Sequence, residues 1–460
     1  MNETKKMNYR TEHDSIGPVE VPADALWGAQ TQRSLNNFPA GLKDGRERMP
    51  DGIISALLTL KKACALANHE LKPDKMTDEK LFAVLSACEK AESSDFSELF
   101  PLSVYQTGSG TQTNMNVNEV IANIAEKTFG YMILHPNDNV NMSQSTNDLF
   151  PSALLIAASL AMEDVKKSVS GLVSALRGLE EKYPDVAKPG RTHLQDAVPL
   201  RFSDEVSGWR GSLERDSLMI EKALGQLAFL PVGGTAVGNG VNCPDGFDAL
   251  VCRFASEYLG REFSPSDNKF HGLTSLDGIV FAHGALKATS CDLMKIANDV
   301  RWMSSGPNCG LGEITIPSNE PGSSIMPGKV NPTQCEALCM VAVRVMGNDA
   351  SVGFAASQGN FELNAFFPVV ASCFLQSAGL MSEAVASFTE KCVKGITPNA
   401  GRMRGYVEKD LMSATLLNPA IGYEKAAQAV KLAQNEGLSL REAVLKLGYM
   451  TPDSFDLLFL

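Results

Sequence analysis

The sequence predicts a mainly α-helical protein built around a bundle of five long helices. Apolar residues recur at every seventh position over two long stretches, whereas strand-like alternation is weak and brief. Apolar heptads sustained over several turns indicate long helices that pack along a seam against partner helices. Hydrophobic residues make up 44% of the chain and charged residues 20%, which suits a globular protein with a large core.

The clearest helical pattern extends from Leu155 to Leu179, and the chain reaches Tyr183-Pro184 soon after it ends. Pro151 suits a first helical turn, and Asn147 and Asp148 just before it are capping candidates. Two sets of apolar residues with heptad spacing define this helix: Leu155, Met162, Val169 and Leu176, and Ala158, Val165, Leu172 and Leu179.

A second heptad pattern predicts a helix over residues 275–305 that ends at Gly306-Pro307. Its apolar positions are Ile279, Leu286, Leu293 and Val300. Other helices are expected over 203–228, 333–352 and 362–391, and a short strand at 313–316. Because helices that are apolar over much of their circumference need cover on several sides, we expect the bundle to form an oligomer.

Three regions are expected along the chain. Residues 1–139 form an N-terminal mixed, mostly helical domain, and residues 140–395 form the central domain of long helices. Residues 396–460 form a small C-terminal helical domain, in which Pro398 and Pro419 interrupt the helices.

Charge and hydropathy exclude several classes of partner. The formal net charge of −12 disfavours nucleic acid or an anionic membrane surface. No stretch approaches the roughly 18 uncharged apolar residues of a membrane span. The first ten residues are polar and lack the apolar core of a signal peptide. We therefore expect a cytoplasmic protein without a nucleic-acid or membrane partner.

The ten cysteines are scattered and form no C-x-x-C cluster of the kind that iron–sulfur and zinc sites use. Cys335 and Cys339 could share a helix face, but two buried apolar thiols explain that spacing better than a ligand pair. We expect no metal and no cofactor. The cysteines are Cys64, Cys88, Cys243, Cys252, Cys291, Cys309, Cys335, Cys339, Cys373 and Cys392.

Two polar segments precede helical patterns and suit an anion. The first, residues 106–114, contains Ser109, Gly110 and Thr111; its glycines allow a close backbone approach, and its hydroxyls lie beside a helix N-terminus. The second is residues 143–148. For both segments, simple helix capping without a ligand is the alternative.

Two further segments carry ionisable residues. His193 has the polar neighbours Arg191, Thr192 and Gln195 in the sequence, a setting that favours acid–base chemistry. The alternative is a histidine with a structural role only. Residues 322–332 form a long loop with Lys329, which could hold a carboxylate, and with Asn331 as a candidate helix cap. The glycines in this loop suit a lid, and a flexible surface loop is the alternative.

The loop from Gly322 to Pro332 reads Gly-Ser-Ser-Ile-Met-Pro-Gly-Lys-Val-Asn-Pro. It resembles the signature loop of the fumarase/aspartase superfamily, Gly-Ser-Ser-x-Met-Pro-x-Lys-x-Asn-Pro. The other three segments match in the same order, so the resemblance covers nearly the whole chain. It implies the three-domain fold of that superfamily, with a central bundle of five long helices. It also implies a homotetramer whose active sites combine segments of different subunits.

Within the superfamily, the chain is most similar to the class II fumarases, which use no metal. His193 stands where aspartases usually carry glutamine, and Gly328 where they usually carry alanine. Residues 359–364 also look like the fumarase version. The implied reaction is the reversible anti addition of water to fumarate, giving (S)-malate through an aci-carboxylate intermediate, a step of the tricarboxylic acid cycle.

The resemblance assigns roles to individual residues. Ser323 takes the C3 proton of malate, and Lys329 and Asn331 stabilise the charge that develops on the carboxylate. His193 handles the departing hydroxyl, with Glu336 as the partner that raises its basicity. The implied substrate contacts are Ser109, Gly110, Thr111, Ser145, Thr146, Asn147, Thr192, Ser324, Lys329, Val330 and Asn331.

The segment His135, Pro136, Asn137 and Asp138 is similar to a secondary dicarboxylate site of class II fumarases. Relatives carry a basic residue shortly before this segment, whereas residues 130–134 of this chain are uncharged. That departure puts the secondary site in doubt more than the catalytic one.

Three other functions are compatible with the sequence. The nearest is an aspartate ammonia-lyase, and the second is a lyase of the same superfamily that cleaves argininosuccinate or a similar fumarate adduct. The third is a non-catalytic structural protein on the same scaffold, as in some lens crystallins. Retention of Ser323, His193, Lys329 and Asn331 argues against the structural use.

Overall fold

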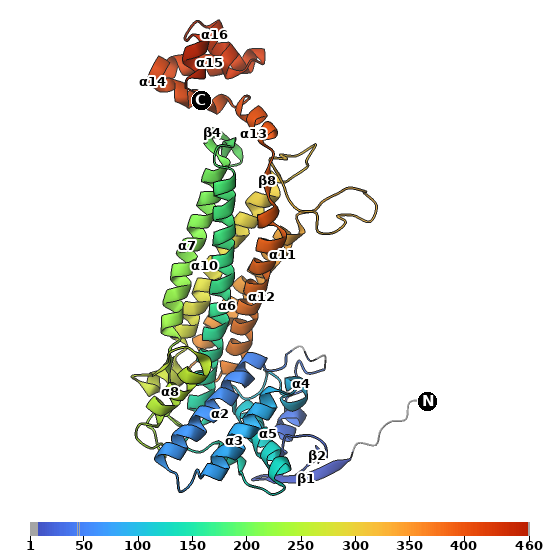
Figure 1. The fold of residues 1–460 in the computed structure, drawn as a ribbon, viewed down its shortest axis with the longest axis vertical. Coiled ribbons are helices and arrows are strands. Elements are labelled where there is room, and N and C mark those ends of the chain that lie inside the picture. The colour runs from blue at the N-terminus through green and yellow to red at the C-terminus, as the bar shows by residue number, and fades with distance from the viewer. Residues whose placement is uncertain (1–7, 44, 46, 459–460) are drawn as a thin grey trace. The chain divides into compact units, whose positions relative to one another are not determined.

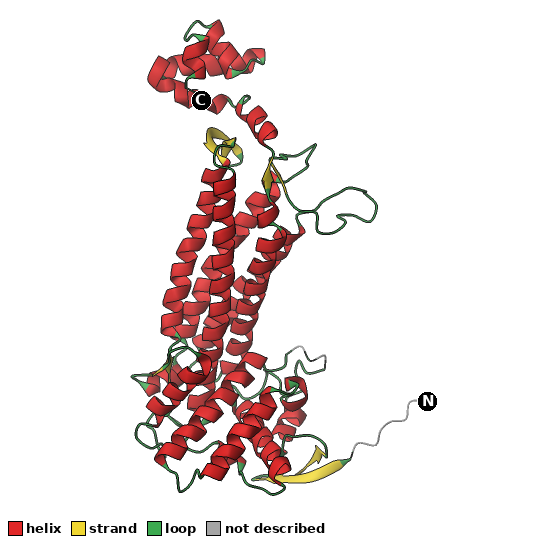
Figure 2. Ribbon diagram, viewed as in Figure 1, coloured by secondary structure: helices red, strands yellow, loops and turns green. Residues whose placement is uncertain are grey.

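The computed structural model describes residues 8–43, 45 and 47–458, so most of the polar first ten residues lie outside the described part. Helices dominate, and strands are few and short (Figure 2), which confirms the mainly α fold. The five predicted long helices are all present and are labelled in Figure 1. They are α6 (Thr146–Lys182), α7 (Phe202–Gln226), α10 (Asp277–Met303), α11 (Thr333–Ala356) and α12 (Phe367–Lys391).

The chain divides into two compact units, and each unit contains one end of all five long helices. The first unit comprises Met1–Lys166, Leu218–Ala288 and Val343–Met381. The second comprises Lys167–Ser217, Thr289–Ala342 and Ser382–Leu460. The expected three-domain division along the chain stays a prediction.

The start of α6 differs from the prediction. Pro151 lies inside the helix and not in its first turn, because the helix already begins at Thr146. Ser145 and Asp148 make this earlier start possible. The Ser145 hydroxyl accepts the Asn147 N–H (3.2 Å), and the Asp148 carboxylate accepts the Ser145 N–H (3.0 Å). Asp148 and Asn147 therefore belong to the first turn, where a carboxylate can satisfy an otherwise unpaired N–H group.

The start of α12 was also predicted wrongly, five residues too early. Residues 360–363 form a tight turn, closed by a backbone bond from the Asn360 N–H to the Leu363 carbonyl (3.1 Å). Asn364 then accepts the Phe366 N–H with its side chain (2.8 Å). This local side-chain bond competes with helix formation and delays the helix to Phe367.

In the first unit, α2 (Asp51–Leu71) packs against α3 (Asp78–Glu92) and α8 (Phe247–Leu259), and α3 packs against α5 (Thr111–Phe129). Figure 1 shows α2, α3 and α5 side by side in blue to cyan. The buried Glu119 of α5 accepts three backbone N–H groups at the start of α1 (Ala29–Asn37). Burial raises the pKa of this carboxyl although the hydrogen bonds oppose the shift.

The described residues contain four two-stranded sheets, of which the sequence indicated only the strand near residue 314. Three pairs are antiparallel, and the pair of β5 and β6 is parallel. The strands are β1 (Tyr9–Asp14) with β2 (Gly17–Pro22), β3 (Ala187–Thr192) with β4 (Gln195–Arg201), β5 (Phe229–Leu230) with β6 (Ser264–Pro265), and β7 (Ile314–Thr315) with β8 (Thr397–Pro398).

The last part of the second unit has its own small apolar core. Three short helices contribute most of it, including Leu417, Ala429, Ala433 and Val444. The remaining helices of the described chain are α4 (Phe96–Leu99), α9 (Lys269–Thr274), α13 (Ala400–Val407), α14 (Asn418–Ile421), α15 (Tyr423–Glu436), α16 (Leu440–Lys446) and α17 (Pro452–Asp456), with a π-helical turn at Pro136–Val140 and 3-10 turns at Val393–Gly395 and Leu411–Leu417.

Although the sequence predicts no membrane span, helices α11 and α12 are long and apolar enough to span a membrane by length and composition. Their most apolar stretches have mean hydropathies of 1.2 and 1.4, and only 28% and 39% of those stretches are buried within the chain. Core helices of soluble proteins pass the same test, so this is weak evidence for a membrane.

Asp216 of α7 is a fully buried carboxylate whose two oxygens make no hydrogen bond with any described residue, and Asp292 is nearby. Burial and the neighbouring carboxylate raise its pKa to about 7, whereas an unfolded aspartate titrates near 3.9. The folded state therefore holds this proton more tightly, and its stability falls as the pH rises from about 4 to 7.

We accordingly expect Asp216→Asn to stabilise the protein at pH 8 by roughly 2–4 kcal/mol and to have little effect at pH 4. Thermal unfolding of both proteins across this range measures the difference. An Asn variant that melts below the wild type at pH 8 would contradict the expectation.

Candidate functional site

Two of the predicted substrate segments come together in the first unit. Gly110 precedes α5 with a φ of 79°, and a Cβ there would lie 2.3 Å from the Phe150 ring. A Cβ on Gly108 would lie 1.5 Å from the carbonyl oxygen of Ala365. Glycine is thus required at both positions by steric contact, and the turn places the Ser109 and Thr111 hydroxyls 2.8 Å apart.

The Ser143–Asp148 segment lies against this helix start. Asn114 of α5 donates to the Thr146 hydroxyl (2.9 Å), and Asn147 donates to the Ala236 carbonyl (2.8 Å). The buried Asp148 also accepts the N–H groups of Gly233 and Thr235, both at 2.9 Å. Burial outweighs these bonds and raises the pKa of Asp148 to about 6.

Both segments line one cavity of about 1120 Å³. Its wall includes Thr111, Ser145, Thr146 and Asn147, all predicted substrate contacts. Hydroxyls, amides and the start of α5 make it a suitable place for a carboxylate. These segments are therefore neighbours in one chain, and their contact with substrate stays a prediction.

Asn137 and Asp138 of the predicted secondary site line the same cavity. His135 lies beside Asp138, and its Nδ1 accepts the Asp138 N–H at 3.2 Å. Three lysines that were not predicted as site residues also line the cavity, namely Lys72, Lys75 and Lys80. The sequence gives them no distinctive signal, because Asp74, Asp78 and Glu79 are interspersed among them.

His193 lies in the second unit, at the tip of the hairpin formed by β3 and β4. His193 and Leu194 form its two-residue turn, with φ values of 56° and 61°. Left-handed backbone at two non-glycine residues costs energy and is typical of functional sites. His193 and the adjacent Thr192 are exposed, as a residue that meets a substrate should be.

A buried ion network holds this hairpin. Glu313 is fully buried, and Arg191 donates to both of its oxygens at 2.8 and 3.0 Å. Lys188 lies 3.8 Å from Glu313 and 2.7 Å from Glu205. Because Arg191 is two residues from His193, the network fixes the strand that carries the histidine.

Glu313→Gln should therefore cost about 3 kcal/mol of stability and lower kcat roughly tenfold, because it leaves the Arg191 guanidinium without its countercharge. Thermal unfolding and steady-state rates measure both effects. Arg201→Ala is the matched control: it breaks an exposed pair with Asp204 at the end of the same hairpin, which should contribute little. Equal effects of the two variants would refute this role of Glu313.

Hydrogen bonds join the two ends of the signature loop, Gly322–Pro332. The Gly322 N–H donates to the Lys329 carbonyl (3.0 Å), and the Asn331 side chain donates to the Gly322 carbonyl (2.7 Å). A Cβ on Gly322 would lie 2.3 Å from the Lys329 carbonyl oxygen, so glycine is required there. Asn331 thus closes the loop, and the prediction that it caps α11 was wrong, since α11 begins at Thr333.

The Ser323 hydroxyl accepts the N–H groups of Ile325 (3.3 Å) and Met326 (3.1 Å). Two amide donors stabilise a serine oxygen as an anion and so favour the activation that a serine base requires. Ser324, Lys329 and Val330 are exposed on the same loop.

Glu336 lies in the first turn of α11 and is exposed. Within the described chain, no hydrogen bond joins it to His193. Their predicted pairing therefore stays a prediction for the assembled protein.

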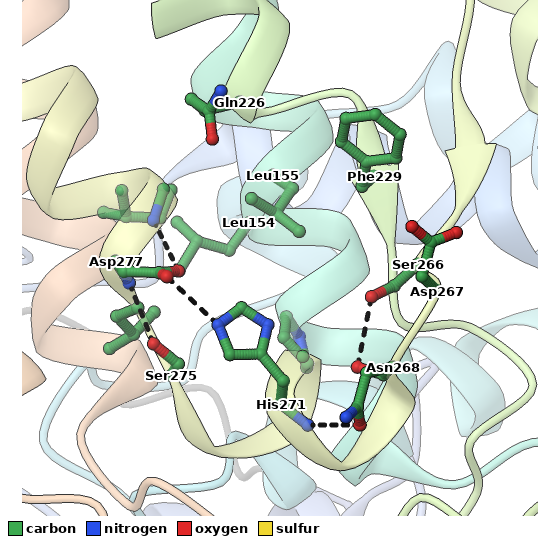
Figure 3. A pocket seen from close by; sticks show the side chains of 15 residues that line it. Leu154, Leu155, Gln226, Phe229, Ser266, Asp267, Asn268, His271, Ser275 and Asp277 are labelled. Carbon is green, nitrogen blue, oxygen red and sulfur yellow. Dashed lines mark hydrogen bonds and ion pairs between the residues drawn. The ribbon is translucent and has the colours of Figure 1, made fainter.

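His271 and His283 have structural partners. His283 is fully buried between Asp349 (3.1 Å) and Ser377 (3.0 Å). His271 lies 3.0 Å from Asp277 on the wall of a cavity of about 270 Å³ (Figure 3). Asp267 and Asp277 both line that cavity, and their charges disfavour a dicarboxylate there.

Among residues 8–43, 45 and 47–458, no three His, Cys, Asp or Glu side chains are grouped to hold a metal ion. The ten cysteines are unpaired thiols.

Comparison with known proteins identifies the class of this fold and site. A family model described as Lyase matches residues 17–347, and a model described as Fumarase C C-terminus matches residues 414–459. Two curated relatives are the class II fumarate hydratases of Bacillus subtilis and Bacillus cereus. They are 52% and 51% identical, and each alignment covers 98% of this chain and 97% of the relative.

Among solved structures, the class II fumarase of Schistosoma mansoni superposes with a TM-score of 0.94 at 38% identity, over 98% of both chains. The chain belongs to the class II fumarate hydratase family, as the signature loop and His193 predicted.

Proposed function

We propose that the protein catalyses the reversible hydration of fumarate to (S)-malate. The observation that carries the proposal is about 50% identity to class II fumarate hydratases over nearly the whole chain, with the loop from Gly322 to Pro332 intact. Those relatives imply a dicarboxylate substrate.

The test follows the ultraviolet absorbance of fumarate after addition of malate to the purified protein in the presence of a chelator. Production of fumarate from malate but not from aspartate is expected. Ammonia release from aspartate at a comparable rate would favour the ammonia-lyase instead. Absence of turnover with either substrate would favour a structural use of the scaffold.

Proton removal is the difficult step, because the carboxylate next to C3 gains a second negative charge. We assign this step to Ser323, whose hydroxyl already accepts two loop amides. Lys329 and Asn331 lie on the same loop and supply a cation and an amide for the developing charge. The geometry of the closed loop supports this assignment.

His193 is assigned to the departing hydroxyl, and Glu336 to the support of its basicity. Thr192 and Ser324 would contact the substrate beside them. The cavity of the first unit would hold a substrate carboxylate through Thr111 and Ser145–Asn147, with the Ser109 hydroxyl next to that of Thr111.

We also propose that the active protein is a cytoplasmic homotetramer with shared sites. Large apolar side chains of α11 are exposed in one chain, for example Met340 (68%) and Phe354 (76%). Their burial between subunits would contribute favourable free energy of the hydrophobic kind. The exposed apolar side chains of α11 therefore support assembly of the subunits through the long helices.

We also propose that residues His135–Asp138 form a secondary dicarboxylate site. Its positive charge would come from lysines elsewhere in the chain and not from a residue just before His135. Lys72, Lys75 and Lys80 line the same cavity as Asn137 and Asp138. They would replace the basic residue that relatives carry before His135.

A further inference from the structure

Lys61 of α2 is a buried cation that the proposed mechanism does not use. Its side chain is only 1% exposed. Its Nζ donates to the side-chain oxygens of Asn141 (3.0 Å) and Gln144 (2.8 Å). Among the described residues, no carboxylate forms an ion pair with it. A buried ammonium without a carboxylate partner is costly, so its position requires an explanation.

The neighbouring Lys62 differs in this respect. It is 8% exposed, but its Nζ lies 2.7 Å from the carboxylate of Glu92 and 4.7 Å from the centre of the Tyr258 ring. Lys62 is thus a conventionally paired lysine on another face of the same helix.

The bonds of Lys61 lead to the predicted substrate segment by two routes. Gln144 is itself part of the Ser143–Asp148 segment. Asn141 also accepts a bond from Asn114 (3.1 Å), and Asn114 donates in turn to the Thr146 hydroxyl (2.9 Å). Asn141, Gln144 and Thr146 all line the large cavity of the first unit. The buried ammonium therefore lies directly behind the wall that is proposed to contact a substrate carboxylate.

We propose that Lys61 is a positioning residue of the dicarboxylate site, which fixes the substrate segment and adds a buried positive charge behind it. The proposal rests on the proposed function of that segment. A charge in a low-dielectric interior acts on a dianion more strongly than an exposed lysine does. This contribution suits a chain with a net charge of −12, which must attract its anionic substrate locally.

The charge of Lys61 depends on pH in the physiological range. Burial lowers its pKa to about 7, and the facing groups are Cys64 of the same helix, Asp148 of α6 and Cys88 of α3. Burial raises the pKa of both thiols, which stay neutral near pH 7, so Asp148 is the one charged group among these three. Lys61 is then cationic below about pH 7 and neutral above it, and attraction for a dianion is lost as the pH rises.

The experiment compares Lys61→Met with Lys62→Met in the full-length protein. Binding of succinate, a non-reacting dicarboxylate, is measured by calorimetry at pH 6.5 and 8.5, together with kcat and KM for malate. Lys61→Met should weaken succinate binding and raise KM about tenfold at pH 6.5, with a smaller effect at pH 8.5 and on kcat. Lys62→Met should leave these constants within about twofold.

Lys61→Arg keeps the charge at every pH and covers the case in which the Met variant fails to fold. Its affinity for succinate should change less between pH 6.5 and 8.5 than that of the wild type. The proposal is overturned if Lys61→Met binds succinate as the wild type does, or if Lys61→Arg keeps the wild-type pH dependence. Since calorimetry needs no turnover, these results are distinct from a wild type that fails to convert malate, which would refute the proposed function.

Discussion

Replacement of Ser323 by alanine is expected to lower kcat by about 10²–10⁴-fold and to leave KM for malate within a few fold. The hydroxyl accepts two amide N–H groups of its own loop, an arrangement that stabilises the deprotonated oxygen more than the neutral one. Its loss removes the proton acceptor but not the groups that hold the carboxylates. Initial rates from fumarate and from malate measure both constants.

Ser324→Ala is the matched control, because it removes the adjacent hydroxyl of the same loop. Ser324 is exposed and is assigned only to substrate binding, so its loss should raise KM more than it lowers kcat. Size-exclusion chromatography establishes that both variants assemble as the wild type does. A Ser323→Ala variant with more than about a tenth of the wild-type kcat would refute the role of Ser323 as the base.

The long helices could be predicted from the sequence because heptad spacing over many turns has few alternative explanations. Their ends were less predictable. Pro151 suggested a first turn, yet Ser145 and Asp148 start α6 earlier through bonds that depend on side-chain geometry. Apolar periodicity also extended the expected α12 to residue 362, where the turn closed by Asn360 and Leu363 prevails.

The strand pairs illustrate a second limit. The hairpin of β3 and β4 contains Pro189, Gly190 and Pro199, which disfavour a strand by local propensity. In the folded chain, Arg191 of β3 donates two hydrogen bonds to Glu313, which is more than a hundred residues away in sequence. A contact so distant in sequence gives no local pattern, and the position of His193 on a turn therefore could not be predicted.

The candidate site also contains one element that could be predicted from the sequence and one that could not. The loop from Gly322 to Pro332 was recognised because its pattern is long and specific, and the comparisons confirm the family that it predicted. Lys61 gives no such signal, since a lysine in an amphipathic helix is ordinarily exposed. Only the fold shows that this lysine is buried behind the substrate segment.

A mixture of two variants that are impaired in different segments is expected to regain activity if each site combines segments of different subunits. Asn147→Ala alters the cavity of the first unit, and Ser323→Ala alters the signature loop of the second. After joint dissociation and reassembly at equal amounts, about a quarter of the sites should combine an intact Asn147 segment from one subunit with an intact Ser323 loop from another. The mixture should therefore regain about a quarter of the wild-type rate.

Ser323→Ala mixed with Lys329→Met is the matched negative control. Both substitutions lie on one loop, whose own backbone bonds keep it a single structural element. Every site in this mixture receives a loop with one of the two defects, so no activity should return. Recovery in both mixtures would indicate contamination or exchange that does not depend on site composition. Failure of the first mixture, with mixed tetramers verified by mass, would show that each site is built from a single chain, and the exposed apolar face of α11 would then need another explanation.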